Sequence, residues 1–409
     1  MGNSVRRARA TLAAAVVWTS LLAALTGCTA RPPADVGSKP GPPADIIRIT
    51  PDDGAKGVAA DGKLEVKLSS GRLERVTVTR IEDAQPIDVP GSISEDGLRW
   101  RPSAGTRLAL AAEYRVDAVA LDAHGRRAAR NATFTTLVPE HRFIGYFNPE
   151  NRSTVGTGMI VSFVFNRKIK ERAAVQRAIR ITAHPPVEVV GHWFDGQRLD
   201  FRPRAHWRPG TKVRVDLRLR DVEGAPDVYG IQHKTTSFTV GRSQISTVDV
   251  RNHTMEVRRG ERLLATLPVT AGARENTTYN GKMVVSEMFD VTRMDGATVG
   301  FRSETGKSEY DIKDVPHAMR LTTSGTFLHG NYWAHPSVFG SSNTSHGCVG
   351  LRDEKGGSQS SPAGWFFDRT LIGDIIEVIN SPDREVDPWN GLSGWNMGWA
   401  EWRAGSAVR

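Results

Sequence analysis

The stretch that decides the architecture of the chain is HGNYWAHPSVFGSSNTSHGCVGL, from His329 to Leu351. It contains Cys348 and three of the eleven histidines, His329, His335 and His346. Its many Gly, Ser and Asn residues predict a long loop that closes onto a strand. Long loops on a rigid scaffold often carry catalytic side chains, so we expect chemistry in this stretch.

The N-terminus has the pattern of an export signal. Arginines at positions 6, 7 and 9 precede an apolar run over residues 10–25, which is too short for a typical membrane span. The run ends in Leu25-Thr-Gly-Cys28, which resembles a bacterial lipobox; an ordinary cleaved signal peptide is the alternative. We expect a lipoprotein signal peptide over residues 1–27, with Cys28 lipidated and the mature chain anchored to the outer face of the membrane, facing the cell wall.

Cysteine usage points to a nucleophile. The chain has two cysteines, and lipidation of Cys28 would leave Cys348 without an intramolecular disulfide partner. A lone thiol in an oxidising compartment is a liability unless it is used. We therefore expect Cys348 to be a nucleophile, with a buried bystander thiol as the alternative.

The composition describes an exported, strand-and-turn protein. The hydrophobic fraction is 39%, with 40 Gly and 22 Pro, and residues 28–45 form a Pro/Gly-rich linker. The net charge of +9 favours anionic wall polymers or lipid head groups, although solubility accounts for it equally well. An exported protein does not meet nucleic acid, so we expect no such partner.

Two similar segments follow the linker, offset by about 100 residues. Leu98-Arg-Trp-Arg-Pro102 is echoed by Leu199-Asp-Phe-Arg-Pro203, and each motif is followed by an alternating strand and then a Phe-Thr strand. Period-two alternation with frequent Gly/Pro turns is typical of a small β-sandwich. We predict tandem Ig-like domains over residues 46–137 and 138–241, acting as spacers or wall-binding modules.

The remainder is expected to form a third β-rich domain over residues 242–379, with a short helix at 362–369 and a closing strand at 373–379. Residues 380–409 hold Trp389, Trp395, Trp399 and Trp402, which is not the composition of a disordered tail. We expect this extension to pack on the other domains. The predicted fold class is thus mainly β.

The chemistry centres on Ser345-His346-Gly347-Cys348. A thiol attacks as its thiolate, so Cys348 needs a nearby base, and Gly347 allows a tight turn that presents amides to an oxyanion. His346 would point the same way as Cys348 if the segment is extended, and the loop would bring His329 close; spacing alone does not choose between them. His253 and His317 are expected in turns or on the surface.

The spacing His329-(16 residues)-His346-Gly-Cys, preceded by Ser, with Ser324-Gly325 upstream, closely resembles the YkuD-like L,D-transpeptidases. The likeness to their actinobacterial lipoprotein type extends over nearly the whole chain. It implies Cys348 as nucleophile and His329 as general base and acid, held by the Gly330 carbonyl. It also implies an oxyanion hole of amides around His346, Gly347 and Cys348. The implied substrate-binding residues are Tyr310, Ser324, Gly325, Trp333, Ser345 and Gly350.

The resemblance implies a reaction on peptidoglycan stem peptides without a cofactor or metal. Cys348 would form a thioester with a donor tetrapeptide and release D-Ala, and an acceptor amine would complete a 3→3 cross-link. Carbapenem-type β-lactams would acylate the same thiol, and a monomer is expected. Position 330 is often Ser in the family, and position 350 is commonly Asn, so Gly350 loses a side-chain contact to the substrate. The alternatives are an L,D-carboxypeptidase, a wall-binding scaffold, and a zinc peptidase, whose ligand spacings are absent.

Overall fold

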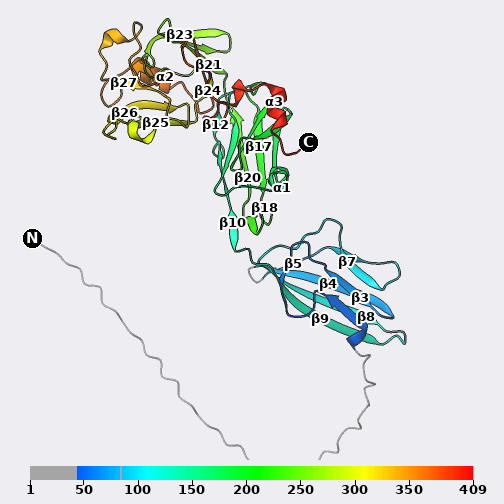
Figure 1. The fold of residues 1–409 in the computed structure, drawn as a ribbon. Helices are drawn as coiled ribbons and strands as arrows, with labels where there is room; N and C mark the ends of the chain where they lie inside the picture. The colour runs from blue at the N-terminus through cyan, green and yellow to red at the C-terminus, as the bar shows by residue number, and fades with distance from the viewer. Residues whose placement is uncertain (1–43, 83–84, 409) are drawn as a thin grey trace, which may run out of the picture.

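The computed structural model describes residues 44–82 and 85–408, and strands dominate it (Figure 1). Two β-sandwiches precede a nine-stranded sheet and a short C-terminal tail, so the predicted mainly β fold class is confirmed. No helix in this described part of the chain has the length and apolar character needed to cross a bilayer. The predicted signal peptide and Cys28 lie outside the described residues, as does nearly all of the 28–45 linker.

The first sandwich pairs a sheet of order β1-β3-β7-β6 with one of order β2-β9-β8-β4-β5. Alternation along β8 turns Tyr114 inward, where it stacks on Phe134 with 5.1 Å between ring centroids. A 3-10 turn, η1 (Ala44–Ile46), leads into it. Its strands are β1 (Ile47–Thr50), β2 (Ala55–Val58), β3 (Glu65–Leu68), β4 (Arg72–Glu82), β5 (Gln85–Asp88), β6 (Gly91–Ile93), β7 (Arg99–Pro102), β8 (Glu113–Leu121) and β9 (Arg127–Thr136).

The second sandwich repeats this plan. Its sheets have orders β11-β13-β16-β15 and β12-β20-β17-β14, which correspond strand by strand to β1-β3-β7-β6 and β2-β9-β8-β4. The repeated sequence motifs therefore mark equivalent strands, β7 and β16. A small sheet, β10-β19-β18, is added. The elements are β10 (His141–Phe143), β11 (Gly145–Asn148), β12 (Thr154–Val155), β13 (Val161–Phe165), α1 (Arg172–Arg177), β14 (Ile179–His184), β15 (Val189–Trp193), β16 (Arg198–Pro203), β17 (Lys212–Arg218), β18 (Glu223–Ala225), β19 (Val228–Gly230) and β20 (His233–Val240).

The C-terminal unit, residues 244–379, is a nine-stranded sheet of order β24-β29-β21-β22-β23-β28-β27-β26-β25. Strands β25 and β26 form a hairpin at its edge, called the flap hairpin below. The elements are β21 (Gln244–Asp249), β22 (Thr254–Arg259), β23 (Arg262–Thr270), β24 (Gly281–Val284), β25 (Glu287–Asp295), η2 (Gly296–Thr298), β26 (Asp311–Arg320), β27 (Phe327–Asn331), η3 (Pro336–Val338), β28 (Val349–Arg352), α2 (Pro362–Phe367) and β29 (Ile375–Ile379).

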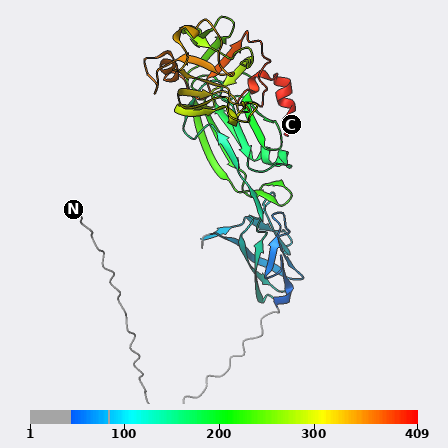
Figure 2. The same ribbon diagram turned by 60° about the vertical axis from the view of Figure 1, so that its left-hand side comes forward.

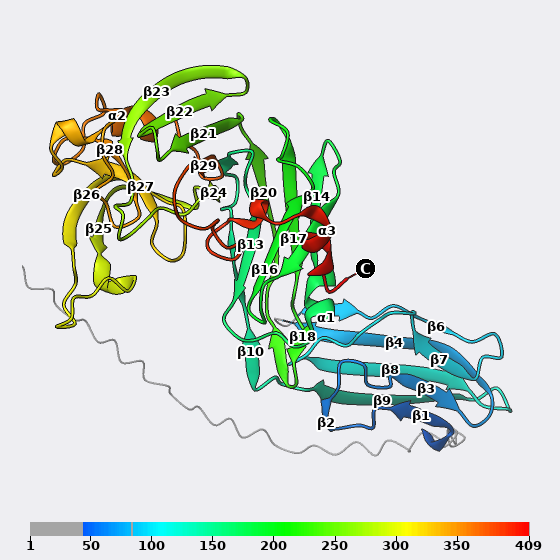
Figure 3. The ribbon, with the colours of Figure 1, turned by 45° about the horizontal axis from the view of Figure 1, so that its top comes forward.

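The tail, residues 380–408, lies against the second sandwich and contains η4 (Gly394–Asn396) and α3 (Trp399–Ala404). The indole of Trp395 donates to the carbonyl of Gly158 at 2.7 Å, and that of Trp402 donates to the carbonyl of Val190 at 2.9 Å. Figures 2 and 3 show the second sandwich between the first sandwich and the C-terminal unit, with the red tail along its side. The tail thus joins the second sandwich to the C-terminal unit.

Candidate active site

Two neighbouring parallel strands bring Cys348 and His329 to one face of the sheet. Strand β27 pairs with β28 so that Leu328 lies opposite Val349 and His329 lies opposite Gly350. Cys348 directly precedes β28, and side chains two residues apart along a strand share a face. Cys348 and His329 are therefore diagonal neighbours at adjacent strands.

The thiol of Cys348 is held in a protonated state. It forms no disulfide with any described residue. Its Sγ donates to the carbonyl of Gly325 at 3.6 Å and accepts from the N–H of Phe327 at 3.4 Å. Burial raises the pKa of the thiol to about 11, because a thiolate would lose its hydration, and the Phe327 amide only partly opposes this effect. Cys348 therefore needs a base to remove its proton during attack.

His329 is placed to be that base. It is 4% exposed, and its Nδ1 lies 2.9 Å from the carbonyl oxygen of Gly330. A carbonyl only accepts, so Nδ1 carries the proton and Nε2 of the neutral ring is free to accept one. Burial lowers the pKa of His329, and the Gly330 contact only partly offsets it. The ring also stacks on Trp333, with 5.5 Å between centroids and 15° between planes.

A buried carboxylate explains why position 330 is glycine. A Cβ there would collide with the side chain of Asp353. Asp353 in turn lies 2.6 Å from Nδ1 of His317, which is buried in β26. The expectation that His317 sits in a turn or on the surface is wrong, because its ring faces this carboxylate. His253, by contrast, lies in the turn between β21 and β22.

The turn before Cys348 is tight rather than extended. Gly347 has a φ of +111°, a backbone conformation that residues other than glycine rarely adopt. The hydroxyl of Ser345 accepts from the Gly347 N–H at 3.1 Å and donates to the Cys348 carbonyl at 2.6 Å. The ring of His346 therefore turns to the flap hairpin, where it packs on Tyr310 and lies 3.5 Å from Glu309. The extended geometry that would align His346 with the thiol is absent.

A cavity of about 450 Å³ has both Cys348 and His329 in its lining. Of the other predicted site residues, His346, Tyr310, Trp333 and Ser345 also line it. Burial, with the nearby Cys348 as a second cause, raises the pKa of Tyr310 to about 12, so its hydroxyl remains a donor. The predicted residues outside this lining are Ser324, Gly325, Gly330, Gly347 and Gly350. The lining residues that sequence reasoning missed are Met294, Ile312, Asn331, Ala334, Val338 and Thr344.

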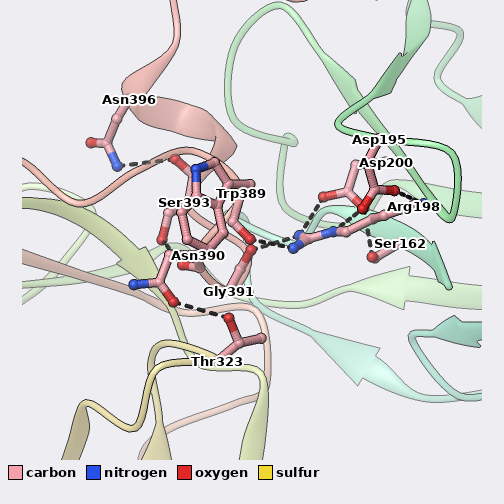
Figure 4. Close-up of polar contacts among 10 residues, drawn as sticks. All are labelled: Ser162, Asp195, Arg198, Asp200, Thr323, Trp389, Asn390, Gly391, Ser393 and Asn396. Carbon is pink, nitrogen blue, oxygen red and sulfur yellow. Dashed lines mark hydrogen bonds and ion pairs between the residues drawn. The ribbon is translucent and has the colours of Figure 1, made fainter. Parts of the chain in front are cut away.

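The Ser324–Gly325 turn lies beside the thiol. Figure 4 shows Asn390 of the tail bonded to the neighbouring Thr323. Asn390 accepts from the Thr323 hydroxyl at 2.9 Å and the Ser324 amide at 3.0 Å, and donates to the Ser324 hydroxyl at 2.8 Å. The guanidinium of Arg198 in β16 donates to the carbonyls of Trp389 and Gly391 on either side of Asn390. Residues from three parts of the chain thus hold the turn whose Gly325 carbonyl accepts from the Cys348 thiol.

His335 does not join this cluster, because it is exposed and bonds Ser337 at the start of η3. Across residues 44–82 and 85–408, no group of three or more His, Cys, Asp or Glu side chains is arranged to hold a metal ion. The arrangement that remains is a thiol, an imidazole and backbone amides around one cavity, which is suited to acyl transfer.

Comparisons with known proteins agree with this chemistry. A family model for the L,D-transpeptidase catalytic domain matches residues 243–378, and one for a bacterial Ig domain matches residues 55–223. L,D-transpeptidase 2 of Mycobacterium tuberculosis (strain CDC 1551 / Oshkosh) is 32% identical over 411 residues, covering 98% of this chain and 96% of the relative. L,D-transpeptidase 5 of Mycobacterium tuberculosis (strain ATCC 25618 / H37Rv) is 27% identical, covering 90% and 78%. A solved LD transpeptidase in complex with imipenem is 28% identical, covering 59% of this chain and 100% of that one, with a TM-score of 0.47.

Proposed function

Because the chain belongs to the L,D-transpeptidase family, we propose that it forms 3→3 cross-links between peptidoglycan stem peptides through a thioester on Cys348. One observation carries the proposal. The protonated thiol of Cys348 and the neutral imidazole of His329 lie at two adjacent strands and line the same cavity. Burial favours the uncharged form of both groups, so the proton moves only as the thiol attacks.

The first half-reaction acylates the enzyme. Sγ of Cys348 attacks the carbonyl carbon of the third stem residue, a diamino acid, while Nε2 of His329 takes the thiol proton. The amides of His346 and Cys348, to which no side chain is hydrogen-bonded among the described residues, stabilise the oxyanion. The bond to the terminal D-Ala then breaks, and His329 delivers the proton to the leaving amine.

The second half-reaction forms the cross-link. The side-chain amine of a second stem peptide attacks the thioester carbonyl, and His329 takes a proton from that amine. The C–S bond breaks, and the proton returns to the sulfur of Cys348. With water as the acceptor, the same steps yield an L,D-carboxypeptidase, which is the alternative function.

Intact mass spectrometry tests the acylation step. A soluble chain lacking residues 1–45 is incubated with a carbapenem, with Cys348→Ala as the control. We expect one stable adduct per wild-type chain and none on the variant. In a separate incubation without the carbapenem, the wild-type chain should release D-Ala from a tetrapeptide and form a dimeric product. Full labelling of Cys348 by a thiol reagent, with no carbapenem adduct and no D-Ala release, would favour the wall-binding scaffold instead.

The pKa shifts predict a specific pH dependence. The lowered pKa of His329 keeps its imidazole neutral through neutral pH, so acylation is expected to fall only as the pH drops through that lowered value. In His329→Ala the thiol has no base, and alkylation of Cys348 should rise with pH toward its pKa of about 11. Rate–pH profiles for both proteins check this, and a half-maximal alkylation rate near pH 8 in the variant would contradict it.

We also propose that the mature chain is a monomer anchored outside the cell membrane through Cys28. The lipobox-like sequence Leu25-Thr-Gly-Cys28 and the Pro/Gly linker after it support this location. Cys28→Ser should move the protein from the membrane fraction to the soluble exported fraction. Unchanged fractionation would indicate another means of attachment.

A further inference from the structure

Asn331, at the end of β27, faces the catalytic cavity without a role in the steps above. It lies two residues after His329 on the same strand, so the two side chains share a face. It is 5% exposed and lines the cavity together with Cys348. A buried amide beside a nucleophile is a candidate for substrate recognition.

The hydrogen bonds of Asn331 fix which way its amide points. Its Oδ1 accepts from the backbone N–H of Ala334 at 3.0 Å, which assigns the oxygen and directs the NH₂ group to the opposite side. Among the hydrogen bonds of the described residues, Nδ2 donates to none. Among the described residues, Nδ2 is not one of the fully buried side-chain atoms that lack a partner, so it is open to the cavity, where an oxygen of a bound ligand can replace water as its acceptor.

Gly350 is the feature that makes room for this amide. It lies two residues after Cys348 and on the same face, about 7 Å along the strand. A Cβ at position 350 would lie 3.3 Å from Nδ2 of Asn331 and 2.9 Å from Cγ2 of Thr270. The Asn331 amide therefore occupies the space that a side chain at position 350 would enter.

We propose that Asn331 is a specificity-determining residue whose Nδ2 donates a hydrogen bond to a carbonyl or carboxylate oxygen of the bound donor stem peptide. Strand β27 thereby supplies an amide at a place where Gly350 on β28 carries no side chain. The inference rests on the proposed function, because it requires a peptide donor at Cys348. It predicts that one amide is needed at this place, and that either strand can supply it.

A double-mutant cycle tests the exchange between the strands. Asn331→Ala should lower kcat/KM for D-Ala release from a tetrapeptide about five- to tenfold, mainly through KM. Gly350→Asn alone crowds Asn331 and should also lower kcat/KM. The double variant Asn331→Ala/Gly350→Asn should recover most of the wild-type value, because the amide returns from the other strand.

Two measurements separate recognition from structural damage. Alkylation of Cys348 by iodoacetamide should stay within about twofold of wild type in Asn331→Ala, since a small reagent does not use the amide. Asn331→Asp keeps the acceptor for Ala334 but loses the donor, so it should lose donor turnover as Asn331→Ala does. Wild-type turnover in both single Asn331 variants, or a double variant weaker than either parent, overturns the inference while leaving the proposed function standing. A wild-type chain that neither releases D-Ala nor is acylated overturns both.

Discussion

The two sandwiches have the same strand order, yet one pair of equivalent sheets is covered differently. The outer face of β1-β3-β7-β6 in the first sandwich has no tail over it, whereas the tail covers the outer face of β11-β13-β16-β15 in the second. On the first sandwich, this face of β3 and β7 carries an ion-pair cluster open to solvent, formed by Glu65, Lys67, Arg99 and Arg101. Val66 pairs with Trp100 in the first sandwich as Val161 pairs with Phe201 in the second, so these two pairs of residues occupy equivalent positions. The equivalent positions of the second sandwich lie under the tail, and they are Ile160, Ser162, Asp200 and Arg202.

The hydrophobic cores differ in the same way. The first sandwich has a core of its own, centred on residues such as Trp100 and Phe134. The core of the second sandwich continues into Val284 and Ile375 of the C-terminal unit and into Trp402 of the tail. One fold therefore occurs once with a hydrophobic core of its own and once with a core that it shares with the C-terminal unit and the tail. The difference lies in what covers the sheet, not in the sheet itself.

The largest effect should come from removing the side chain that joins the tail to the second sandwich. Trp402 is fully buried and stacks on His192, so Trp402→Ala should destabilise the second sandwich and C-terminal unit by about 3–5 kcal/mol. Denaturant unfolding measures this loss. Trp389→Ala, at a side chain that is 55% exposed, is the matched control and should change stability by less than about 0.5 kcal/mol. Equal effects of the two variants would contradict a shared core.

Arg202 of the second sandwich and Arg101 of the first occupy equivalent positions, so the stability lost on replacing each compares the two faces directly. Arg202 lies within 4.4–5.4 Å of the ring centroids of three tail tryptophans and donates to the Met397 carbonyl at 2.8 Å. Its burial lowers its pKa to about 10. Arg202→Ala should cost about 2–4 kcal/mol, through lost cation–π contacts and packing. Arg101→Ala removes a solvent-exposed partner of Glu65 and should cost less than about 1 kcal/mol. Comparable unfolding free energies for both variants would break the distinction between the two faces.

The sequence was sufficient for those features that leave a local pattern. The motifs at residues 98–102 and 199–203 predicted the repeated sheets, because strand periodicity and turn residues are local signals. Cys348 and His329 were likewise singled out by a motif and by cysteine arithmetic, and the structure places them at one cavity. Their catalytic roles stay predictions.

Other features had no local signal. Asn390 reaches Ser324 from 66 residues away, and nothing in the tail sequence separates it from an ordinary polar turn residue. The His317–Asp353 pair and the approach of the Asn331 amide to Gly350 depend on which strands lie side by side. The sequence left open whether the segment from His346 to Cys348 is extended, and the positive φ of Gly347 shows that it turns instead. Long-range contacts decided the Asn390 and His317 cases, whereas the local backbone of Gly347 decided the orientation of His346.

The third prediction tests whether the contacts of the tail influence the reactivity of Cys348. Asn390 is 2% exposed, and Asn390→Ala removes the partner of the Ser324 amide and one of the partners of its hydroxyl, which also contacts Thr322. We expect acylation by a carbapenem to slow by about tenfold, corresponding to about 1–2 kcal/mol, because the Gly325 carbonyl beside Cys348 is no longer held. Asn131→Ala, on the exposed surface of β9 in the first sandwich, is the control. An unchanged rate in Asn390→Ala would mean that the tail stabilises the fold without positioning the site.

The smallest effect is an acid sensitivity confined to the first sandwich. Burial alone would raise the pKa of Glu65, but hydrogen bonds from Lys63, Arg101 and Lys67 outweigh it and lower the pKa to about 2. A carboxyl with a lowered folded-state pKa stabilises the fold above its usual value near 4.5, and this contribution is lost as the pH falls toward 2. Because the cationic partners are largely exposed, we expect a loss of only about 1–2 kcal/mol. Glu65→Gln should remove this part of the pH dependence in calorimetry of the first sandwich. The second sandwich has Ile160 at the equivalent position, so its transition should be unaffected by the substitution at any pH. A shift there would show that the first sandwich does not unfold independently of the second.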